Sequence, residues 1–391
     1  MSAASLQRTV LTLAAAAYFA AGCWATPASA AVFGNDDRRD LPPANQSLAN
    51  KIGLLTDLKS RSQCTAVCLS ENIIATAAHC LYRTQGERRP DLANFRFKLH
   101  GRPDQSASRI AGTRPGAAMA HVMTGSMSLR VKPPIEATRD WALVHLETPV
   151  CQFGGLPLSE HPVAELNASQ TTQPVYQVGY HRDFPGERLA FGTPCTISSS
   201  FRNANRTTIA SDFENAEDLI LHTCDTGGAS SGSPLLIDGP DGPEIAGLNV
   251  GTYVLSRVVS ANGVVTHRYQ AENVANTGVS ARAFADALET FTAADVLAAR
   301  NGMRELQGLL AGVGVYTGPR NGIYGFQTRT AIETFERIEG RTVTGLATTE
   351  LMKALRTSLV ARSAAPHTPP SAHLETGSVQ GLGLTSSSKK N

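Results

Sequence analysis

Three short segments of this 391-residue chain carry, in order, a histidine, an aspartate and a serine. A serine hydroxyl is a weak nucleophile until a base within hydrogen-bond reach takes its proton. A histidine ring titrates near neutral pH and can act as that base, while an aspartate on its other ring nitrogen fixes the tautomer. The segments are TAAHC (76–80), DWAL (140–143) and SGSP (231–234). They predict nucleophilic catalysis by Ser231, with His79 as the base and Asp140 as its partner.

The order of these residues narrows the class of enzyme. Subtilisins carry their triad in the order Asp, His, Ser, and α/β-hydrolases in the order Ser, acid, His. On its three motifs, the segment 32–290 resembles the trypsin-like serine endopeptidases, in particular the bacterial branch that includes the glutamyl endopeptidases. The resemblance implies an all-β, chymotrypsin-like double β-barrel, with His79 and Asp140 on the first barrel and Ser231 on the second. It also implies hydrolysis of a polypeptide substrate through an acyl-enzyme, without a metal or cofactor.

The same segment has the pattern of a β protein, because short apolar runs alternate with Gly- and Pro-rich turns. Apolar residues 142–146 predict a strand. Residues 235–237 and 244–250 flank an Asp-Gly turn, and Asn262-Gly263 suits a tight turn, so both predict hairpins. Residues 281–289 resemble the family's closing C-terminal helix. We therefore expect the peptidase domain to span 31–290.

The N-terminal segment predicts export. Arg8 precedes an apolar stretch, 10–22, and Ala28-Ser29-Ala30 matches a signal-peptide cleavage site, so 1–30 is predicted to be a signal peptide. The stretch is too short to span a bilayer, and no other segment is long and apolar enough, so we expect no membrane span. A lipoprotein site at Cys23 is the alternative, although the usual Leu is missing. A net charge of +2 predicts no general attraction to nucleic acid.

Cleavage after Ala30 would leave six cysteines, and an even number in an exported protein predicts three disulfides. No Cys or His spacing matches a zinc site, so no metal is expected. The resemblance implies a Cys64–Cys80 bridge that closes just after the catalytic histidine. Cys195 and Cys224 both belong to the second half and are expected to pair, which leaves Cys68–Cys151.

Two positions near the nucleophile depart from the family pattern. The resemblance assigns the oxyanion hole to the backbone N–H groups of Ala229 and Ser231, but the family usually has Gly where Ala229 stands. Taking Ser230 as the nucleophile would restore Gly-x-Ser but would place Ser, not Gly, after it, so the intact SGSP favours Ser231. Ser230 also replaces the Asp that trypsin-type zymogens use for activation, so we expect no such ion pair. Residues 32–38 instead resemble the start of the glutamyl-endopeptidase branch.

The residues that would select the substrate side chain are Asp225 and three residues of the wall strand, Asn249, Val250 and Gly251. Asp225 lies six residues before Ser231, where trypsin carries the acid that attracts Arg or Lys. Glutamyl endopeptidases have an Asp at the same relative place, together with a wall-strand His for which this chain has Asn249. The Asn argues against a preference for Glu, and the sequence assigns no substrate side chain.

The C-terminal part has a helical period. Apolar residues recur at helical spacing around 303–313, 328–335 and 351–355. With NGIYG at 321–325 and VTGL at 343–346, the segment 297–357 resembles a peptidoglycan-binding-like three-helix module, which implies peptidoglycan as a second partner. The family usually has Asp at 321 and Gln at 336, where this chain has Asn321 and Glu336. A role as a cap or spacer on the peptidase is the alternative. The composition of 361–391 predicts a disordered tail.

Three functions follow from these features. The leading hypothesis is an exported serine endopeptidase in the periplasm, cell envelope or medium. The second is a cell-wall-binding protein whose peptidase-like domain is catalytically weak, because Ala229 disturbs the oxyanion hole. The third is a peptidoglycan peptide hydrolase, although the missing zinc-ligand spacing argues against the metal-dependent kind.

Overall fold

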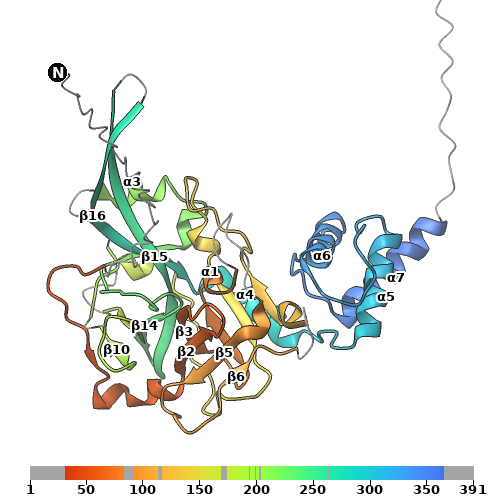
Figure 1. Ribbon diagram of the computed structural model, residues 1–391, viewed down its shortest axis with the longest axis horizontal. Coiled ribbons are helices and arrows are strands. Elements are labelled where there is room, and N and C mark those ends of the chain that lie inside the picture. The colour runs from red at the N-terminus through yellow and green to blue at the C-terminus, as the bar shows by residue number, and fades with distance from the viewer. Residues whose placement is uncertain are drawn as a thin grey trace, which may run out of the picture. The chain divides into compact units, whose positions relative to one another are not determined.

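The computed structural model describes residues 31–82, 91–112, 117–168, 174–192, 194–198, 200–201, 204–261 and 264–364, without the side chains of 255–273. The expected signal peptide, 1–30, and the tail from residue 365 onward lie outside the described residues. The chain folds as two compact units, Met1–Ala294 and Asp295–Asn391. The first unit is mostly β-sheet and the second contains helices (Figure 1).

A seven-stranded antiparallel sheet forms the first half of the first unit. Its strand order is β6-β5-β2-β3-β4-β8-β7. Buried side chains such as Leu55, Phe97 and Val144 fill its core. The strands are β2 (Ile52–Asp57), β3 (Gln63–Cys68), β4 (Ile73–Thr76), β5 (Phe95–Leu99), β6 (Ser108–Arg109), β7 (Val122–Thr124) and β8 (Ala142–His145).

A second seven-stranded antiparallel sheet, in the order β1-β10-β9-β14-β15-β16-β13, forms the other half. Both expected hairpins are confirmed: Gly239 pairs with Gly242, and Ala261 pairs with Val264. The strands of the second hairpin continue as a ribbon past the rest of the sheet (Figure 1). The strands are β1 (Arg39–Asp40), β9 (Tyr176–Tyr180), β10 (Leu189–Phe191), β13 (Leu219–His222), β14 (Pro234–Gly239), β15 (Gly242–Ala261) and β16 (Val264–Ser280), with a separate pair β11 (Ser200–Phe201) and β12 (Ala204–Asn205).

Short helices connect the strands of this unit, and the expected helix after the last strand is present as α4 (Arg282–Ala293). On α4, the ring of Phe291 stacks on His145 of β8 at 4.1 Å, and Phe284 lies 5.9 Å from Trp141. The helix therefore fastens the end of the unit to the first sheet. The others are η1 (Pro43–Asn50), α1 (Ala78–Tyr82), η2 (Leu92–Asn94), η3 (Ala117–His121), η4 (Ala137–Arg139), α2 (Val163–Ala168), α3 (Arg206–Ala210) and η5 (Ala216–Asp218).

The second unit contains the helices α5 (Arg300–Gly312), α6 (Phe326–Ile338) and α7 (Thr349–Ala364), at the positions that the apolar period predicts. Their buried apolar side chains form its core: Met303, Leu306, Leu310, Ile332, Phe335, Leu351 and Leu355. The expected start of the disordered tail needs correction, because α7 continues past residue 361 to Ala364. The helical period simply extends further than the change in composition suggested.

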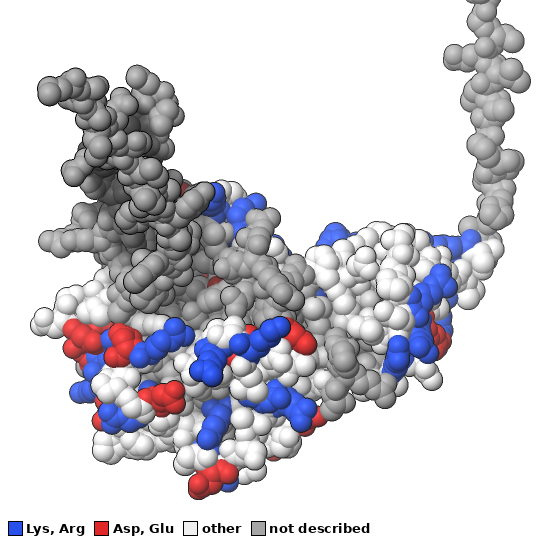
Figure 2. Space-filling model, viewed as in Figure 1, with Lys and Arg blue, Asp and Glu red and all other residues white. Residues whose placement is uncertain are grey.

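Two further features of the fold are the surface charge and the character of the helices. On the face shown in Figure 2, acidic and basic side chains of the first unit are interspersed, as a net charge of +2 allows. In the part of the chain that the structure describes, every helix falls short of the length and apolar character needed to cross a bilayer.

Candidate active site

Strand register brings His79 and Asp140 together. The neighbouring strands β4 and β8 pair Thr76 with Ala142. His79 follows β4 on the short helix α1, and Asp140 precedes β8 directly after η4. The two side chains therefore leave the same end of the first sheet.

Two hydrogen bonds fix the orientation of the histidine. Asp140 Oδ2 lies 2.7 Å from His79 Nδ1, and Asp140 Oδ1 accepts a bond of 2.9 Å from the backbone N–H of His79. The Asp140 side chain is 9% exposed, whereas that of His79 is 26% exposed. Because the buried carboxylate engages Nδ1, proton exchange with a reacting group has to use Nε2.

Ser231 lies in the turn between β13 and β14, and strand β3 holds this turn beside His79. The backbone N–H of Thr65 donates to Ser231 O at 3.0 Å, and Thr65 Oγ1 donates to Ala229 O at 2.9 Å. The neighbouring Cys64 forms a disulfide with Cys80, the residue after His79. One strand thus anchors both the histidine helix and the serine turn.

Gly232 allows this close approach. Its φ is +80°, and a Cβ at this position would lie 2.3 Å from Thr76 Oγ1 and 2.4 Å from Thr65 O. A side chain would therefore push the serine turn away from β3 and β4. The glycine after the expected nucleophile is a steric requirement of the fold.

Ala229 adopts a backbone conformation that normally belongs to glycine. Its φ is +79°, in the left-handed region that costs a residue with a Cβ about 1–2 kcal/mol. Within the described part of the chain, the N–H groups of Ala229 and Ser231 have no hydrogen-bond partner. Two backbone donors near the serine are therefore available to an oxygen of a bound molecule.

The structure joins the cysteines in the three pairs expected from the sequence: Cys64–Cys80, Cys68–Cys151 and Cys195–Cys224. Cys64, Cys80 and His79 lie close enough together to resemble a metal site. Both sulfurs belong to the disulfide, however, so they offer no thiolate to a cation.

Asp225 is occupied by the N-terminal segment of the described chain. Its carboxylate accepts the backbone N–H of Phe33 at 2.8 Å and that of Asp37 at 3.2 Å. Ala31 forms a β-bridge with Thr226. Burial raises the pKa of the Asp225 carboxyl, while its two N–H donors act in the opposite direction. Sequence reasoning missed this contact, because it joins segments separated by 192 and 188 residues.

Arg38, whose side chain is 3% exposed, also anchors the N-terminal segment. Its guanidinium pairs with Asp36 and with Asp183, each at 2.7 Å. Asp183 follows β9, so this pair ties the segment to the second sheet. The start of the domain therefore holds the base of the serine turn through Asp225 and the end of β9 through Arg38.

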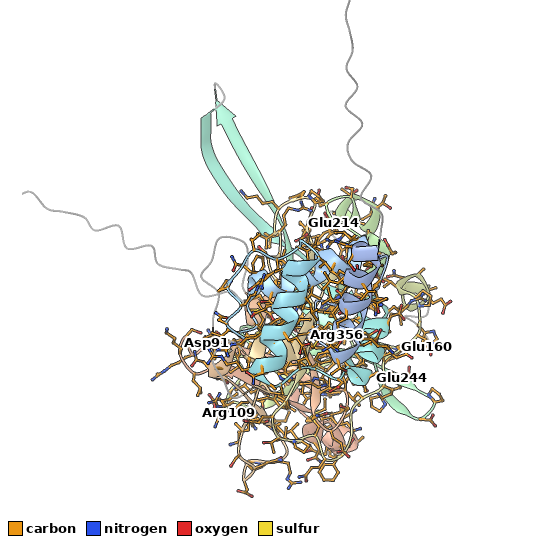
Figure 3. The ribbon with its side chains drawn as sticks, turned by 90° about the vertical axis from the view of Figure 1, so that its right-hand side faces the viewer. Asp91, Arg109, Glu160, Glu214, Glu244 and Arg356 are labelled. Carbon is orange, nitrogen blue, oxygen red and sulfur yellow. A yellow bond between two sulfur atoms is a disulfide. The ribbon has the colours of Figure 1, made fainter. Side chains whose placement is uncertain are left out.

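The three wall-strand candidates on β15 divide into two groups. Val250 and Gly251 line a cleft of about 660 Å³ that also includes His79 and Asp140. Asn249 is 2% exposed, and its side chain contacts Ser230 and His222 instead. The apolar side of the cleft includes Ile135, Phe213 and Tyr253, and its rim includes Arg130, which pairs with Glu214, labelled in Figure 3.

In the second unit, both departures from the family pattern make structural contacts. Asn321 Oδ1 accepts the backbone N–H of Ile323 at 2.9 Å. The Glu336 carboxylate accepts the N–H groups of Thr344 at 2.7 Å and Gly345 at 2.9 Å. Burial raises the pKa of Glu336, and these donors oppose the shift. Asn321 and Glu336 therefore hold the loops around α6.

The first unit combines a serine turn with a His–Asp pair on antiparallel sheets, the set of groups expected for a hydrolase of the serine-peptidase type. Comparison with protein-family models agrees: the model "Trypsin-like peptidase domain" matches residues 64–242, which include His79, Asp140 and Ser231. The model "Putative peptidoglycan binding domain" matches residues 299–355. No curated protein matches the chain. The chain thus contains a trypsin-like peptidase domain followed by a peptidoglycan-binding domain.

Proposed function

We propose that the protein is an exported serine endopeptidase that uses His79, Asp140 and Ser231 as a catalytic triad. The observation that carries this proposal is the 2.7 Å contact between His79 Nδ1 and Asp140 Oδ2, beside a serine turn held by Thr65. We further propose that the two sheets are the two barrels of a chymotrypsin-like domain. We also propose, from the resemblance of residues 32–38, that this domain belongs to the glutamyl-endopeptidase-like branch.

The chemistry follows from these positions. Ser231 Oγ attacks the carbonyl carbon of the scissile peptide, and its proton passes to His79 Nε2. The C–N bond then breaks, and the leaving amine takes the proton from Nε2. Water attacks the resulting ester and gives its proton to Nε2. The C–O bond to Ser231 breaks, and Oγ recovers that proton. Asp140 stabilises the imidazolium in both steps.

The backbone N–H groups of Ala229 and Ser231 would bind the oxyanion that forms in each step. Each such donor contributes about 3–4 kcal/mol to transition-state stabilisation. Ala229 has the positive φ that a glycine would adopt, so its Cβ does not prevent this backbone conformation. This conformation favours the peptidase over a catalytically weak binding protein.

We propose that a polypeptide substrate binds in two clefts, one lined by the His–Asp pair and one lined by Ala229 of the serine turn. The first cleft includes His79, Val250 and Gly251, and a second of about 470 Å³ includes Ala229 and Gln63. Asp225 is buried and already holds the N-terminal segment, so we assign it a structural role rather than contact with a basic side chain.

Labelling with a fluorophosphonate probe tests the proposal. Ser231 of the purified protein should become modified, and Ser231→Ala or His79→Ala should cut turnover by several orders of magnitude. The double variant should be little worse than either single variant, because the residues act as one proton-transfer unit. Ser230→Ala is the matched control and should keep activity. Loss of activity in Ser230→Ala, with activity retained in Ser231→Ala, would show that Ser230 rather than Ser231 is the nucleophile.

The location and second partner follow from the other unit. The disulfides and the peptidoglycan-binding domain point to an extracellular or envelope location. We propose that the C-terminal unit attaches the peptidase to peptidoglycan. The competing role, a cap or spacer on the peptidase, predicts no sedimentation with purified sacculi.

A further inference from the structure

Asn249 contacts the chain on both sides of the expected nucleophile. Its amide Nδ2 donates to Ser230 O at 3.1 Å and approaches Ser230 Oγ at 3.3 Å. Its backbone O accepts the N–H of Gly232 at 2.7 Å, and its backbone N–H donates to Ser233 O at 2.9 Å. The backbone bonds would survive a change of side chain at position 249. The two amide contacts with Ser230 would not.

His222 determines which way the Asn249 amide points. It is fully buried at the end of β13, and its Nε2 lies 3.2 Å from Asn249 Oδ1. Burial lowers the pKa of His222 to about 3, so the ring is neutral. Since Asn249 uses its NH₂ group on Ser230, its oxygen faces His222, and Nε2 must then carry the ring proton.

The backbone carbonyl of Ser230 accepts a second hydrogen bond in addition to the one from Asn249. Ser233 Oγ donates to Ser230 O at 2.6 Å, and Gln177 approaches Ser233 Oγ from β9. Together, the two donors to Ser230 O fix the orientation of the peptide bond between Ser230 and Ser231. The N–H of Ser231 belongs to that same peptide unit. The orientation of an oxyanion donor is therefore coupled to the Asn249 amide.

We infer that Asn249 and His222 are positioning residues that orient the Ser230–Ser231 peptide for catalysis, Asn249 directly and His222 through Asn249. The inference rests on the proposed serine-peptidase function and assigns neither residue a contact with substrate. The Asn249 side chain is absent from the lining of the cleft beside His79. Loss of the amide should consequently slow chemistry without changing how substrate binds.

The test compares full-length variants in peptide hydrolysis and in the rate of fluorophosphonate labelling. Asn249→Leu has a similar size but no donor, and we expect kcat to fall about 10- to 100-fold because a reacting group is misplaced. KM should stay within about threefold, since the cleft is unchanged. The labelling rate should fall in parallel with kcat. If Asn249→Leu does not fold, Asn249→Ala, which also lacks a donor, replaces it with the same expectation.

Two variants of His222 distinguish a positioning role of its ring N–H from a role in packing alone. His222→Gln places an amide donor where Nε2 stands and an acceptor in place of Nδ1, and it should stay within about threefold of the wild-type kcat. His222→Leu removes the donor and should lose kcat as Asn249→Leu does. Melting temperatures are measured for each variant, with assays run well below the lowest one.

Three outcomes overturn the inference. One is a wild-type kcat and labelling rate in folded Asn249→Leu or Asn249→Ala. A second is an equal loss in His222→Gln and His222→Leu, which would indicate packing alone. The third is a change in KM with kcat preserved, which would make Asn249 a substrate contact. If Ser231 of the wild-type protein is never labelled by the fluorophosphonate, the proposed function itself is overturned. That result concerns the wild type and is therefore distinguishable from the other three, which concern the variants.

Discussion

Replacing Ala229 by glycine should stabilise the peptidase domain. A residue with a Cβ at φ +79° carries a strain of about 1–2 kcal/mol. Glycine removes that strain but gains freedom in the unfolded chain, which offsets about 0.4–1 kcal/mol. The difference leaves a gain of up to about 1.5 kcal/mol. For a domain of this size the melting temperature should rise by about 2–4 °C for each kcal/mol gained.

The activity of the same variant tests the oxyanion hole. In Ala229→Gly the N–H at position 229 can keep its direction without strain, so kcat should equal or exceed the wild-type value. Ala229→Val is the matched control. A β-branched residue is a steric outlier at positive φ, so the backbone should leave this conformation and turn the N–H away. Loss of one such donor lowers kcat by about 10²–10³-fold.

Calorimetry on the purified proteins gives the stability, and initial rates on an unstructured peptide give kcat and KM. A lower melting temperature in Ala229→Gly, or full activity in Ala229→Val, would refute the reasoning from φ. A hundredfold gain in kcat for Ala229→Gly would instead favour the hypothesis of a catalytically weak, wall-binding protein.

Further predictions concern other parts of the chain. A variant ending at Ala294 should still hydrolyse peptides but stay in solution when mixed with sacculi, whereas full-length Ser231→Ala should sediment; equal behaviour of the two would remove the wall-binding role. Asp225→Asn keeps only one oxygen for two N–H donors, so the melting temperature should fall while the cleavage preference in a peptide library stays the same. Lost cleavage after Arg or Lys would make Asp225 a substrate contact. Folding raises the pKa of the Glu336 carboxyl above its ordinary value of 4.5. The wild-type protein therefore loses stability as pH rises from 4.5 through the pKa of the folded state, and Glu336→Gln should become more stable relative to it over that range. An unchanged difference in melting temperature from pH 4 to 8 would contradict this.

Hairpins and helices that are specified by short sequence patterns could be predicted from the sequence alone. The Asp-Gly and Asn-Gly turns predicted both hairpins, and the apolar period predicted the C-terminal helices. The residues expected to form the triad stayed recognisable because each sits in a short motif. In the structure, His79 and Asp140 then meet through the pairing of Thr76 with Ala142.

Contacts between distant segments carried no such signal. Asp225 looked like a specificity residue because only its distance from Ser231 was visible, whereas its partners are Phe33 and Asp37. His222 ends an apolar run, LILH, and a histidine on such a strand is the one hint that a buried polar partner exists. Its partner Asn249 becomes apparent only when β13, β15 and the serine turn are placed together.

Strand β3 carries two cysteines, Cys64 and Cys68, four residues apart. One closes a loop of 16 residues around His79, and the other closes a loop of 83 residues that contains Asp140. An exchange of partners between these two cysteines during oxidative folding would join Cys64 to Cys151 and Cys68 to Cys80, and it would pull the histidine helix along β3. Such a species would be fully oxidised and inactive. Yield of active enzyme should therefore depend on disulfide isomerisation, which takes seconds to hours and needs a thiolate to begin. A redox buffer during refolding should raise specific activity without changing the number of free thiols at the end.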